Sequence, residues 1–170
     1  MGHKLSDSEV EQVLLKGTSV TIGMIDESGH PETAALTYVW DSKRKAVLLH
    51  GSKENGLMKR LAEQETIAGT IVVDTEVDAP EFTLRYRSVN LSGSLQVESV
   101  ENFAPDMALL CAKYLGKDYP RDHFARTMSN LGSALTIFKW TQILLAVGVM
   151  ICQSFRCYSL LQVLATWIRG

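Results

Sequence analysis

The sequence predicts a mainly β protein, with about six antiparallel strands closed into a small barrel and a few helices attached to it. Six segments have either the period-two alternation or the short apolar run of a strand. The early segments are joined by short polar turns, and strands do not alternate regularly with helices. These three observations favour a barrel over a doubly wound sheet.

A short helix and three strands open the chain. Ser6 and Glu9 have the spacing of a capping box ahead of an apolar helical repeat, and Gly17 can end that helix. Parallel strands need a long crossover, so strands joined by short polar turns are expected to form an antiparallel meander. The three strands are expected over residues 18–25, 32–40 and 45–50.

The rest of the chain mixes helices with strands. Leu57 and Leu61, four residues apart among charged neighbours, predict a helix after Ser52. Gly93 interrupts a long alternating stretch and predicts a bulge or a bend in it. Strands are expected over residues 67–74, 82–100 and 133–140, an acidic loop over 75–80, and helices over 105–116 and 122–131.

Composition limits the classes of function. A chain of 170 residues has room for one ordinary domain, and 46% apolar with 21% charged residues is typical of a globular protein. The 17 Lys and Arg against 19 Asp and Glu give a net charge of -2, so no basic field gathers nucleic acid. The cysteines match no metal spacing, and the polar start of the chain does not resemble a signal peptide. We expect no metal and a cytoplasmic location.

The most apolar part of the sequence is the stretch 143–168. Its uninterrupted apolar run ends at Cys152, too early for a membrane-spanning helix of about 20 residues. Farther on, apolar residues repeat at helical spacing up to Ile168. We expect one domain over residues 1–140 and an atypical apolar extension over 141–170, helical and packed on the domain or on a dimer. A membrane-proximal anchor and an altered reading frame are the alternatives.

The segment from His50 to Lys59 leads from a strand end through a loop of small residues into a helix. Unpaired N–H groups and the helix dipole favour an anion at such a junction. The Ser52 hydroxyl and the ammonium groups of Lys53 and Lys59 add to that field, so the segment is a candidate phosphate site. A capped helix with solvated lysines is the alternative.

A second motif, Tyr86-Arg87-Ser88-Val89, places arginine and hydroxyl side chains inside a strand. Alternation puts Arg87 and the preceding Arg85 on one face and Tyr86 and Ser88 on the other. If Ser88 faces inward, its hydroxyl needs a partner such as a cofactor. A solvent-facing arginine pair is the alternative.

The order of these elements resembles the FMN-binding split barrels of the pyridoxamine 5′-phosphate oxidase-like superfamily, and within it the flavin-nucleotide-binding branch that contains the nitroimidazole-resistance reductases. The likeness rests on a meander ending in His-Gly-Ser, a Leu-Met-Lys-Arg-Leu helix and a Tyr-Arg-Ser-Val strand followed by a glycine, and it covers residues 5–138. It implies a homodimer with two FMN molecules at the subunit interface, each site shaped by both chains.

The resemblance also implies which residues hold FMN. Residues 34–38 match the strand beside the isoalloxazine, Leu49 and His50 lie near the ring and the ribityl chain, and the following loop takes the phosphate. Within that loop, Ser52 and Lys53 are expected to retain FMN more strongly than Lys59. The full expected set is Ala35, Leu36, Thr37, Tyr38, Leu49, His50, Gly51, Ser52, Lys53, Asn55, Lys59, Arg87 and Ser88.

Two features depart from the family pattern. Relatives usually have Arg or Lys just before or at the position of Leu57, where this chain has Gly56 and Leu57. The residues 167–170 do not supply the Arg-Leu-x-Pro type of ending with which pyridoxamine phosphate oxidases hold their substrate. Oxidation of a vitamin is therefore disfavoured.

An FMN-dependent oxidoreductase is the favoured function. Electrons would pass from NADH, NADPH or another donor to a small aromatic or nitro-aromatic acceptor, with the cofactor supplying the chemistry. His50 is the candidate catalytic group near the flavin or substrate; a strand-end histidine bonded to backbone is the alternative. The competing functions are a non-catalytic flavin-binding, storage or redox-responsive protein, and a dimeric barrel without flavin. Heme or a deazaflavin in place of FMN also stays open.

Overall fold

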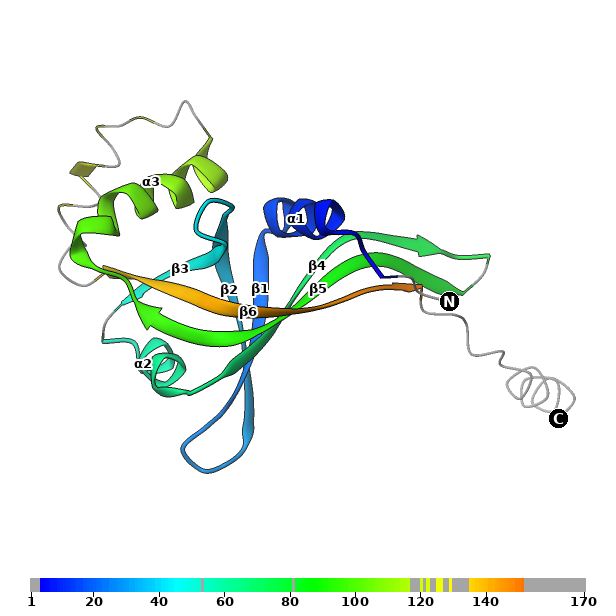
Figure 1. Ribbon diagram of the computed structural model, residues 1–170, viewed down its shortest axis with the longest axis horizontal. Coiled ribbons are helices and arrows are strands. Elements are labelled where there is room, and N and C mark those ends of the chain that lie inside the picture. Colours follow the sequence, from blue (N-terminus) through cyan, green and yellow to red (C-terminus); the bar gives the residue numbers. More distant parts are fainter. Residues whose placement is uncertain are drawn as a thin grey trace, which may run out of the picture.

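The structure is a computed structural model that describes residues 4–52, 54–80, 82–116 and 135–151, with the single residues 120, 122, 125, 126 and 129. Six strands of this part of the chain form a closed antiparallel barrel in the order β1-β2-β3-β6-β5-β4 (Figure 1). The predicted fold class is confirmed. The elements are α1 (Asp7–Lys16), β1 (Ser19–Ile25), β2 (Pro31–Asp41), β3 (Ala46–Ser52), α2 (Gly56–Glu63), β4 (Ile67–Asp78), β5 (Thr83–Val97), α3 (Val100–Leu115) and β6 (Leu135–Ile151).

The first helix begins as the sequence predicts. The Ser6 side chain accepts a hydrogen bond from the Glu9 N–H, and the Glu9 carboxylate accepts one from the Ser6 N–H at 2.8 Å. This capping box satisfies donors that the first turn leaves unpaired. The apolar side of α1 then places Val10, Val13 and Leu14 in the barrel core.

The core fills the barrel and continues into the helices at its ends. Trp140 and Tyr38 are fully buried inside, and Met58 and Leu61 of α2 belong to the same cluster. Gly69 lies against Trp140 so closely that a Cβ atom would be 2.8 Å from the indole Cη2. A glycine is therefore needed on β4 where the largest core side chain passes.

The third helix covers the outside of part of the barrel. Met107 and Leu110 of α3 pack on Leu48 of β3 and Ile137 of β6 in a second apolar cluster. Next to this cluster, the buried Asp106 carboxylate pairs with Arg44 of the β2–β3 turn. The outward sides of β2, β3 and β6 are thus partly removed from solvent.

Several boundaries differ from the sequence prediction. The expected acidic loop is wrong over residues 75–78, because β4 continues to Asp78 through a bulge at Asp74, whose φ of 56° lies in the left-handed region. Helix α3 begins at Val100 rather than at Pro105, because Ser99, in an extended conformation, sets the helix start. The bulge predicted at Gly93 is confirmed by a register shift between Ser92 and Ser94.

Strand β6 is much longer than predicted and crosses the expected boundary at residue 140. The backbone of residues 144–151 pairs with residues 85–92 of β5, so the expected helix is wrong for residues 141–151. The edge of a fifteen-residue β5 offers unpaired backbone groups, which a neighbouring strand satisfies. Residues 152–170 and most of the expected helix 122–131 lie outside the described residues, and the division into domain and extension stays a prediction.

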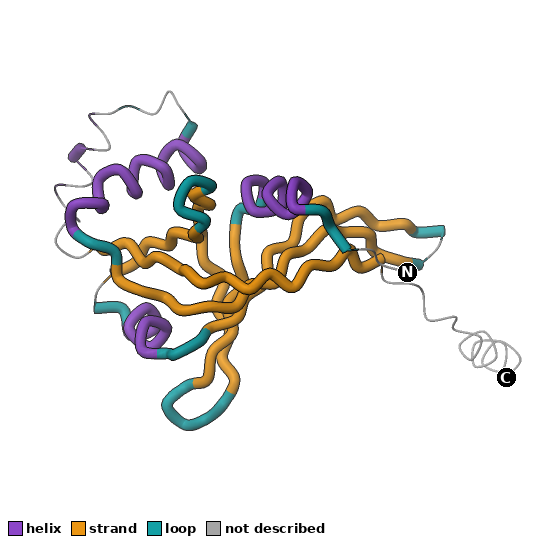
Figure 2. The backbone as a smooth tube through the Cα atoms, in the orientation of Figure 1, coloured by secondary structure: helices purple, strands orange, loops and turns teal. Residues whose placement is uncertain are grey.

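The long ends of β4, β5 and β6 project from the barrel as a three-stranded arm, opposite the end that carries α3 (Figure 2). Helix α1 lies beside the base of this arm. The arm carries the second sequence motif away from the strand end that carries the first.

Candidate functional site

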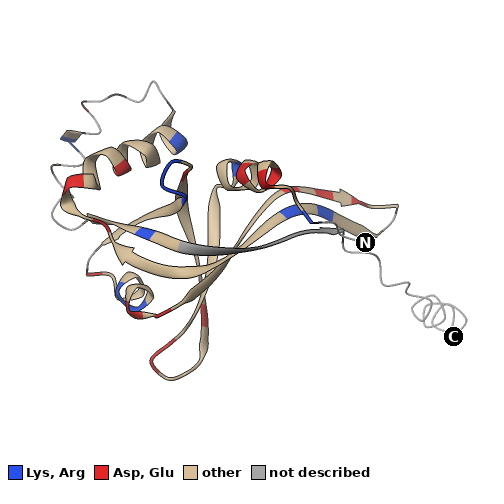
Figure 3. Ribbon diagram, in the orientation of Figure 1, with Lys and Arg blue, Asp and Glu red and all other residues tan. Residues whose placement is uncertain are grey.

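Small and uncharged side chains occupy many outward positions of β1, β2, β4 and β5, next to a few larger apolar ones such as Val72. Alternation buries Val20 and Ile22 and turns their neighbours outward, and the register continues this pattern across the pairs Thr21↔Ala35, Thr21↔Thr70 and Thr70↔Asn90. Figure 3 shows charged residues gathered on helices, turns and the arm, with few along β1. We call this the small-residue surface; its exposed or half-buried members are Ser19, Thr21, Thr33, Ala35, Thr37, Ala68, Thr70, Ser88, Asn90 and Ser92.

The first group of expected site residues lies at the boundary between this surface and α3. Tyr38 pairs with Leu49, so Thr37 and His50 come next on the same outward side of the barrel. Tyr114 joins α3 to β2 next to these residues. Its hydroxyl accepts a hydrogen bond from the Tyr38 N–H at 2.8 Å and donates one to the Tyr38 carbonyl oxygen at 2.6 Å. Sequence spacing gives no signal for this contact.

His50 supplies the one imidazole among the expected site residues. Its side chain is exposed at the surface, yet burial by the surrounding protein lowers its pKa. No hydrogen bond of the imidazole is found within the described part of the chain, and a histidine bonded to backbone stays the alternative. At neutral pH the ring is a neutral group with both a donor and an acceptor available.

The strand residues beside His50 divide by their direction. Ala35 and Thr37 face outward, whereas Tyr38 and Leu49 are fully buried in the core and Leu36 packs against it. The Tyr38 hydroxyl donates to the Leu14 carbonyl at 2.7 Å. Buried members of the expected set therefore shape the site through the backbone and not through their side chains.

The loop before α2 uses its polar side chains on its own backbone. Ser52 Oγ accepts from the Glu54 N–H at 3.2 Å, and Asn55 Oδ1 accepts from the Leu57 N–H at 2.9 Å as the helix cap. A hydroxyl that accepts still has its own hydrogen to donate, so Ser52 keeps a donor for an anion. The Lys59 side chain is exposed, and Lys53 lies outside the described residues.

Gly51 has a packing role in the same loop. A Cβ atom there would lie 2.6 Å from Met58 Cγ, so the glycine allows α2 to pack against the strand end. Met58 is buried in the core. The close approach fixes the start of α2 relative to His50.

The second group lies on β5 and confirms the predicted alternation. Ser88 pairs with Val72 on the outward side, whereas Arg87 points to the other side, where its Nε donates to Asp74 Oδ2 at 2.7 Å. Asp74 also pairs with Lys16 of α1. Hydrogen bonds from Lys16 and then Arg87 lower the pKa of the Asp74 carboxyl. Arg87 therefore links the arm to α1 through Asp74, and the predicted alternative of a solvent-facing arginine does not describe it.

The two groups lie on opposite sides of one barrel. In the strand order of the ring, β2 and β5 are separated by two strands in either direction. Outward side chains on these strands, such as Thr37 and Ser88, therefore point in roughly opposite directions. One chain does not bring all the expected site residues around a single ligand.

Solved structures with this arrangement of strands were found, although no protein-family model and no curated protein matches the sequence. Three of them have low sequence identity but cover most of the chain. The chain has the split-barrel fold that these solved structures share. The resemblance inferred from the sequence is therefore confirmed for the fold.

The flavocytochrome Anf3 of Azotobacter vinelandii superimposes with a TM-score of 0.70 at 17% identity, over 93% of this chain and 73% of that one. The FAD and heme binding protein of Mycobacterium smegmatis gives 0.66 at 15% identity, over 96% and 79%. A protein of Bacteroides thetaiotaomicron described as a 5-nitroimidazole antibiotic resistance protein gives 0.66 at 13%, over 88% and 89%.

The described residues hold neither a metal cluster nor a membrane-spanning helix. Among the described residues, no group of three or more His, Cys, Asp or Glu side chains is arranged to hold a metal ion. In the same part of the chain, no helix is long and apolar enough to cross a membrane.

Proposed function

We propose that this split barrel binds FMN between two copies of the chain and passes electrons from a nicotinamide or another donor to a small aromatic or nitro-aromatic acceptor. The observation that carries the proposal is the separation of the expected site residues onto opposite sides of the barrel. Two copies related by a twofold axis would bring the β2–β3 group of one against the β5 group of the other. The names of the similar structures, a flavocytochrome and an FAD and heme binding protein, support a flavin as the ligand.

The residues at the surface fit a flavin ring. Small side chains such as Ala35 and Thr37 let a planar ring lie close to the strand backbone, whose polar groups can bond its edge. No charged side chain lies among the members of the small-residue surface. The surface therefore favours a flat, largely apolar group over an ion.

The loop before α2 fits a phosphate less fully. Ser52 keeps one hydroxyl donor, and Lys59 is the exposed cation on the first turns of α2. Arg60 pairs with Glu32 at 2.8 Å, which directs its charge toward the β1–β2 turn. Ser52 and Lys53 are proposed to hold the phosphate, with Lys59 contributing less.

His50 is proposed to stand beside the reacting part of the flavin or substrate. FMN, when bound, supplies transfer of a hydride or of single electrons. The neutral imidazole would hold or release a proton at one ring nitrogen while the other orients it. The expected cytoplasmic location would give access to NADH and NADPH.

Purification of the full chain tests the proposal directly. We expect a yellow protein whose visible flavin band is bleached by NADH or NADPH and restored by a nitro-aromatic acceptor. The His50→Ala variant is expected to retain FMN and to reoxidise more slowly. A colourless protein that does not take up added FMN would refute the proposal.

Binding of the phosphate can be tested separately with two lysine variants. A charge-assisted hydrogen bond contributes about 1.5 to 3 kcal/mol, so Lys53→Ala is expected to weaken FMN binding by roughly ten- to more than a hundredfold. Lys59→Ala is the matched control and is expected to cost little. Equal affinities, or a larger loss for Lys59→Ala, would place the phosphate elsewhere.

A non-catalytic flavin-binding, storage or redox-responsive protein is the second candidate. One observation favours it: His50 supplies the sole imidazole among the expected site residues, so this set offers few groups for proton transfer. The same bleaching experiment separates the two. Bound flavin that no nicotinamide reduces would support the carrier.

A further inference from the structure

Tyr86 lies on the outward side of β5, at the point where the small-residue surface meets the arm. Side chains alternate along a strand, and the pairing of β5 with β6 runs without a shift from Arg85 to Ser92. Tyr86 therefore stands on the same side as Ser88, two residues or about 7 Å away along the strand. Among the described residues at the outward positions of β1, β2, β4 and β5, Tyr86 carries the one aromatic ring.

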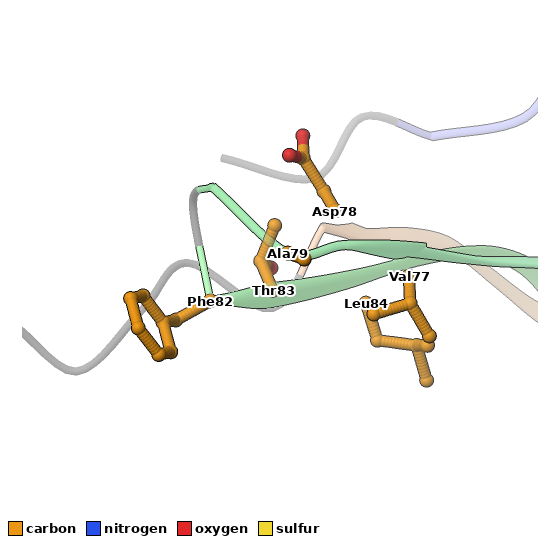
Figure 4. A pocket seen from close by; sticks show the side chains of 6 residues that line it. All are labelled: Val77, Asp78, Ala79, Phe82, Thr83 and Leu84. Atoms are coloured by element: carbon orange, nitrogen blue, oxygen red, sulfur yellow. The ribbon is translucent and has the colours of Figure 1, made fainter.

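Apolar side chains border Tyr86 on this side of the arm. Val77 pairs with Leu84 toward the tip, and Val72 lies toward the barrel. Figure 4 shows Val77 and Leu84 on one side of the hairpin and Asp78 on the other. The side that carries Tyr86 thus presents an aromatic ring among apolar groups, which suits contact with the flat face of another ring.

The charged neighbours of Tyr86 in sequence are engaged on the other side of the strand. Arg87 pairs with Asp74, and Arg85 pairs with Asp78. The Tyr86 side chain is half-buried, and no hydrogen bond of its hydroxyl is found within the described part of the chain. Tyrosine combines a large apolar ring with a polar tip and is enriched where two chains meet. Tyr86 is therefore placed to contact a group outside its own chain.

The inference rests on the proposed function, in which the β5 group of one chain faces the β2–β3 group of the other. In that arrangement Ser88 comes next to the partner's Thr37 and the partner's His50. Because Tyr86 is about 7 Å from Ser88 on the same side, it reaches this site whichever way the arm crosses the partner. The His50 of its own chain lies on a different side of the barrel, since β3 and β5 are not neighbours in the ring.

We propose that Tyr86 selects the electron acceptor at the site of the partner chain, by stacking its ring on a small aromatic molecule held beside the partner's His50. Stacking of two rings favours an aromatic acceptor over a non-aromatic one of similar size. With a nitro-aromatic acceptor, the nitro group takes two electrons and two protons from reduced FMN and loses water to become a nitroso group. Tyr86 takes no part in that transfer; it orients the ring that carries the nitro group.

Two substitutions separate the ring of Tyr86 from the rest of its side chain. Tyr86→Leu stays apolar and is expected to raise the Kd of nitrobenzene about two- to tenfold, measured by its effect on the spectrum of oxidised FMN. Tyr86→Phe keeps the ring and is expected to bind nitrobenzene as the natural protein does. Retention of FMN and reoxidation by ferricyanide, which has no ring, are expected to be unchanged in both. Phe82→Leu removes an exposed ring from the tip of the arm and is the matched control. An unchanged Kd in Tyr86→Leu would overturn the inference.

Mixing two variants tests whether Tyr86 acts in the site of the partner. His50→Ala and Tyr86→Leu each alter both sites of a homodimer, but a mixed dimer has one site in which both residues are natural. Dissociation and reassociation of the two variants together is therefore expected to produce a fast phase of reoxidation by nitrobenzene that neither variant shows alone. Mixed dimers that hold FMN but lack this phase would overturn the inference and leave the proposed function standing. A chain that binds no FMN would refute both.

Discussion

The two halves of the barrel exterior are built differently. Over β3 and β6, helix α3 buries Leu48, Ile137 and Met107 and adds the buried pair of Asp106 with Arg44. Over β1 and β4, no described helix lies on the outward side chains, most of which are small and uncharged within the barrel. The half covered by α3, here called the sealed half, contributes apolar packing and ion pairs to the stability of the fold. A half left open with small side chains is suited to a flat ligand and a second copy of the chain.

The largest expected effect comes from removing the cation of the sealed half. Arg44 pairs with Asp106 and Asp41 and lies 3.5 Å from Glu98, and the Asp106 side chain is only 2% exposed. Arg44→Met leaves a buried carboxylate unpaired and is expected to cost about 3 to 5 kcal/mol in the free energy of unfolding. Urea titration followed by circular dichroism measures it.

Arg85→Met is the control in the exposed arm. The Arg85 side chain is 56% exposed, so its pair with Asp78 is expected to contribute less than about 1 kcal/mol. Similar losses for the two variants would contradict the distinction between the sealed half and the exposed regions.

The next prediction compares two glycines on the paired strands β1 and β4, one facing the barrel core and one facing outward. A Cβ atom at Gly69 would lie 2.8 Å from Trp140 Cη2 and 2.9 Å from the Thr21 carbonyl oxygen, so Gly69→Ala is expected to cost about 1 to 3 kcal/mol. At Gly23, on the outward side of β1, nothing lies within 4 Å, and Gly23→Ala is expected to be neutral or to stabilise by up to about 1 kcal/mol. Thermal unfolding of both proteins decides this, and a destabilised Gly23→Ala would show that the outward side is not open.

The last expected effect is on the pH dependence of stability. Burial acts to raise the pKa of Glu98, but hydrogen bonds from Lys139 and Asn102 outweigh it and lower the pKa to about 2. A carboxyl with a lowered folded-state pKa stabilises the fold above the ordinary value of 4.5. That contribution is lost as the pH falls from 4.5 through about 2. Urea midpoints taken from neutral pH to about pH 2 should fall less steeply in Glu98→Gln; an unchanged slope would rule out this role.

The sequence was sufficient for the elements whose signals are local. The capping box of Ser6 and Glu9, the alternation around Val20 and Ile22 and the bulge at Gly93 each depend on neighbouring residues, and each is found where predicted. The length of β6 depends on pairing with β5, which is distant in sequence. Its apolar residues fit a buried helix and a strand equally well by pattern alone.

The arrangement of the candidate site residues was not predictable from the sequence. His50 and Ser88 could be singled out by motif, yet their places on different sides of the barrel follow from the strand order. The partners of Arg87 could not be foreseen, because Asp74 comes into reach only through a bulge in β4. Tyr114 reaches Tyr38 across 76 positions of sequence, a contact that no spacing rule describes.

Sedimentation velocity of the full chain with FMN, followed at the flavin absorbance, tests most directly the claim that two copies share the site. We expect flavin to sediment only with a dimer, at one FMN per chain. Dilution that dissociates the dimer is expected to release the flavin into solution as well. A stable monomer that sediments with FMN bound would contradict both the dimer and the site built from opposite sides of two barrels.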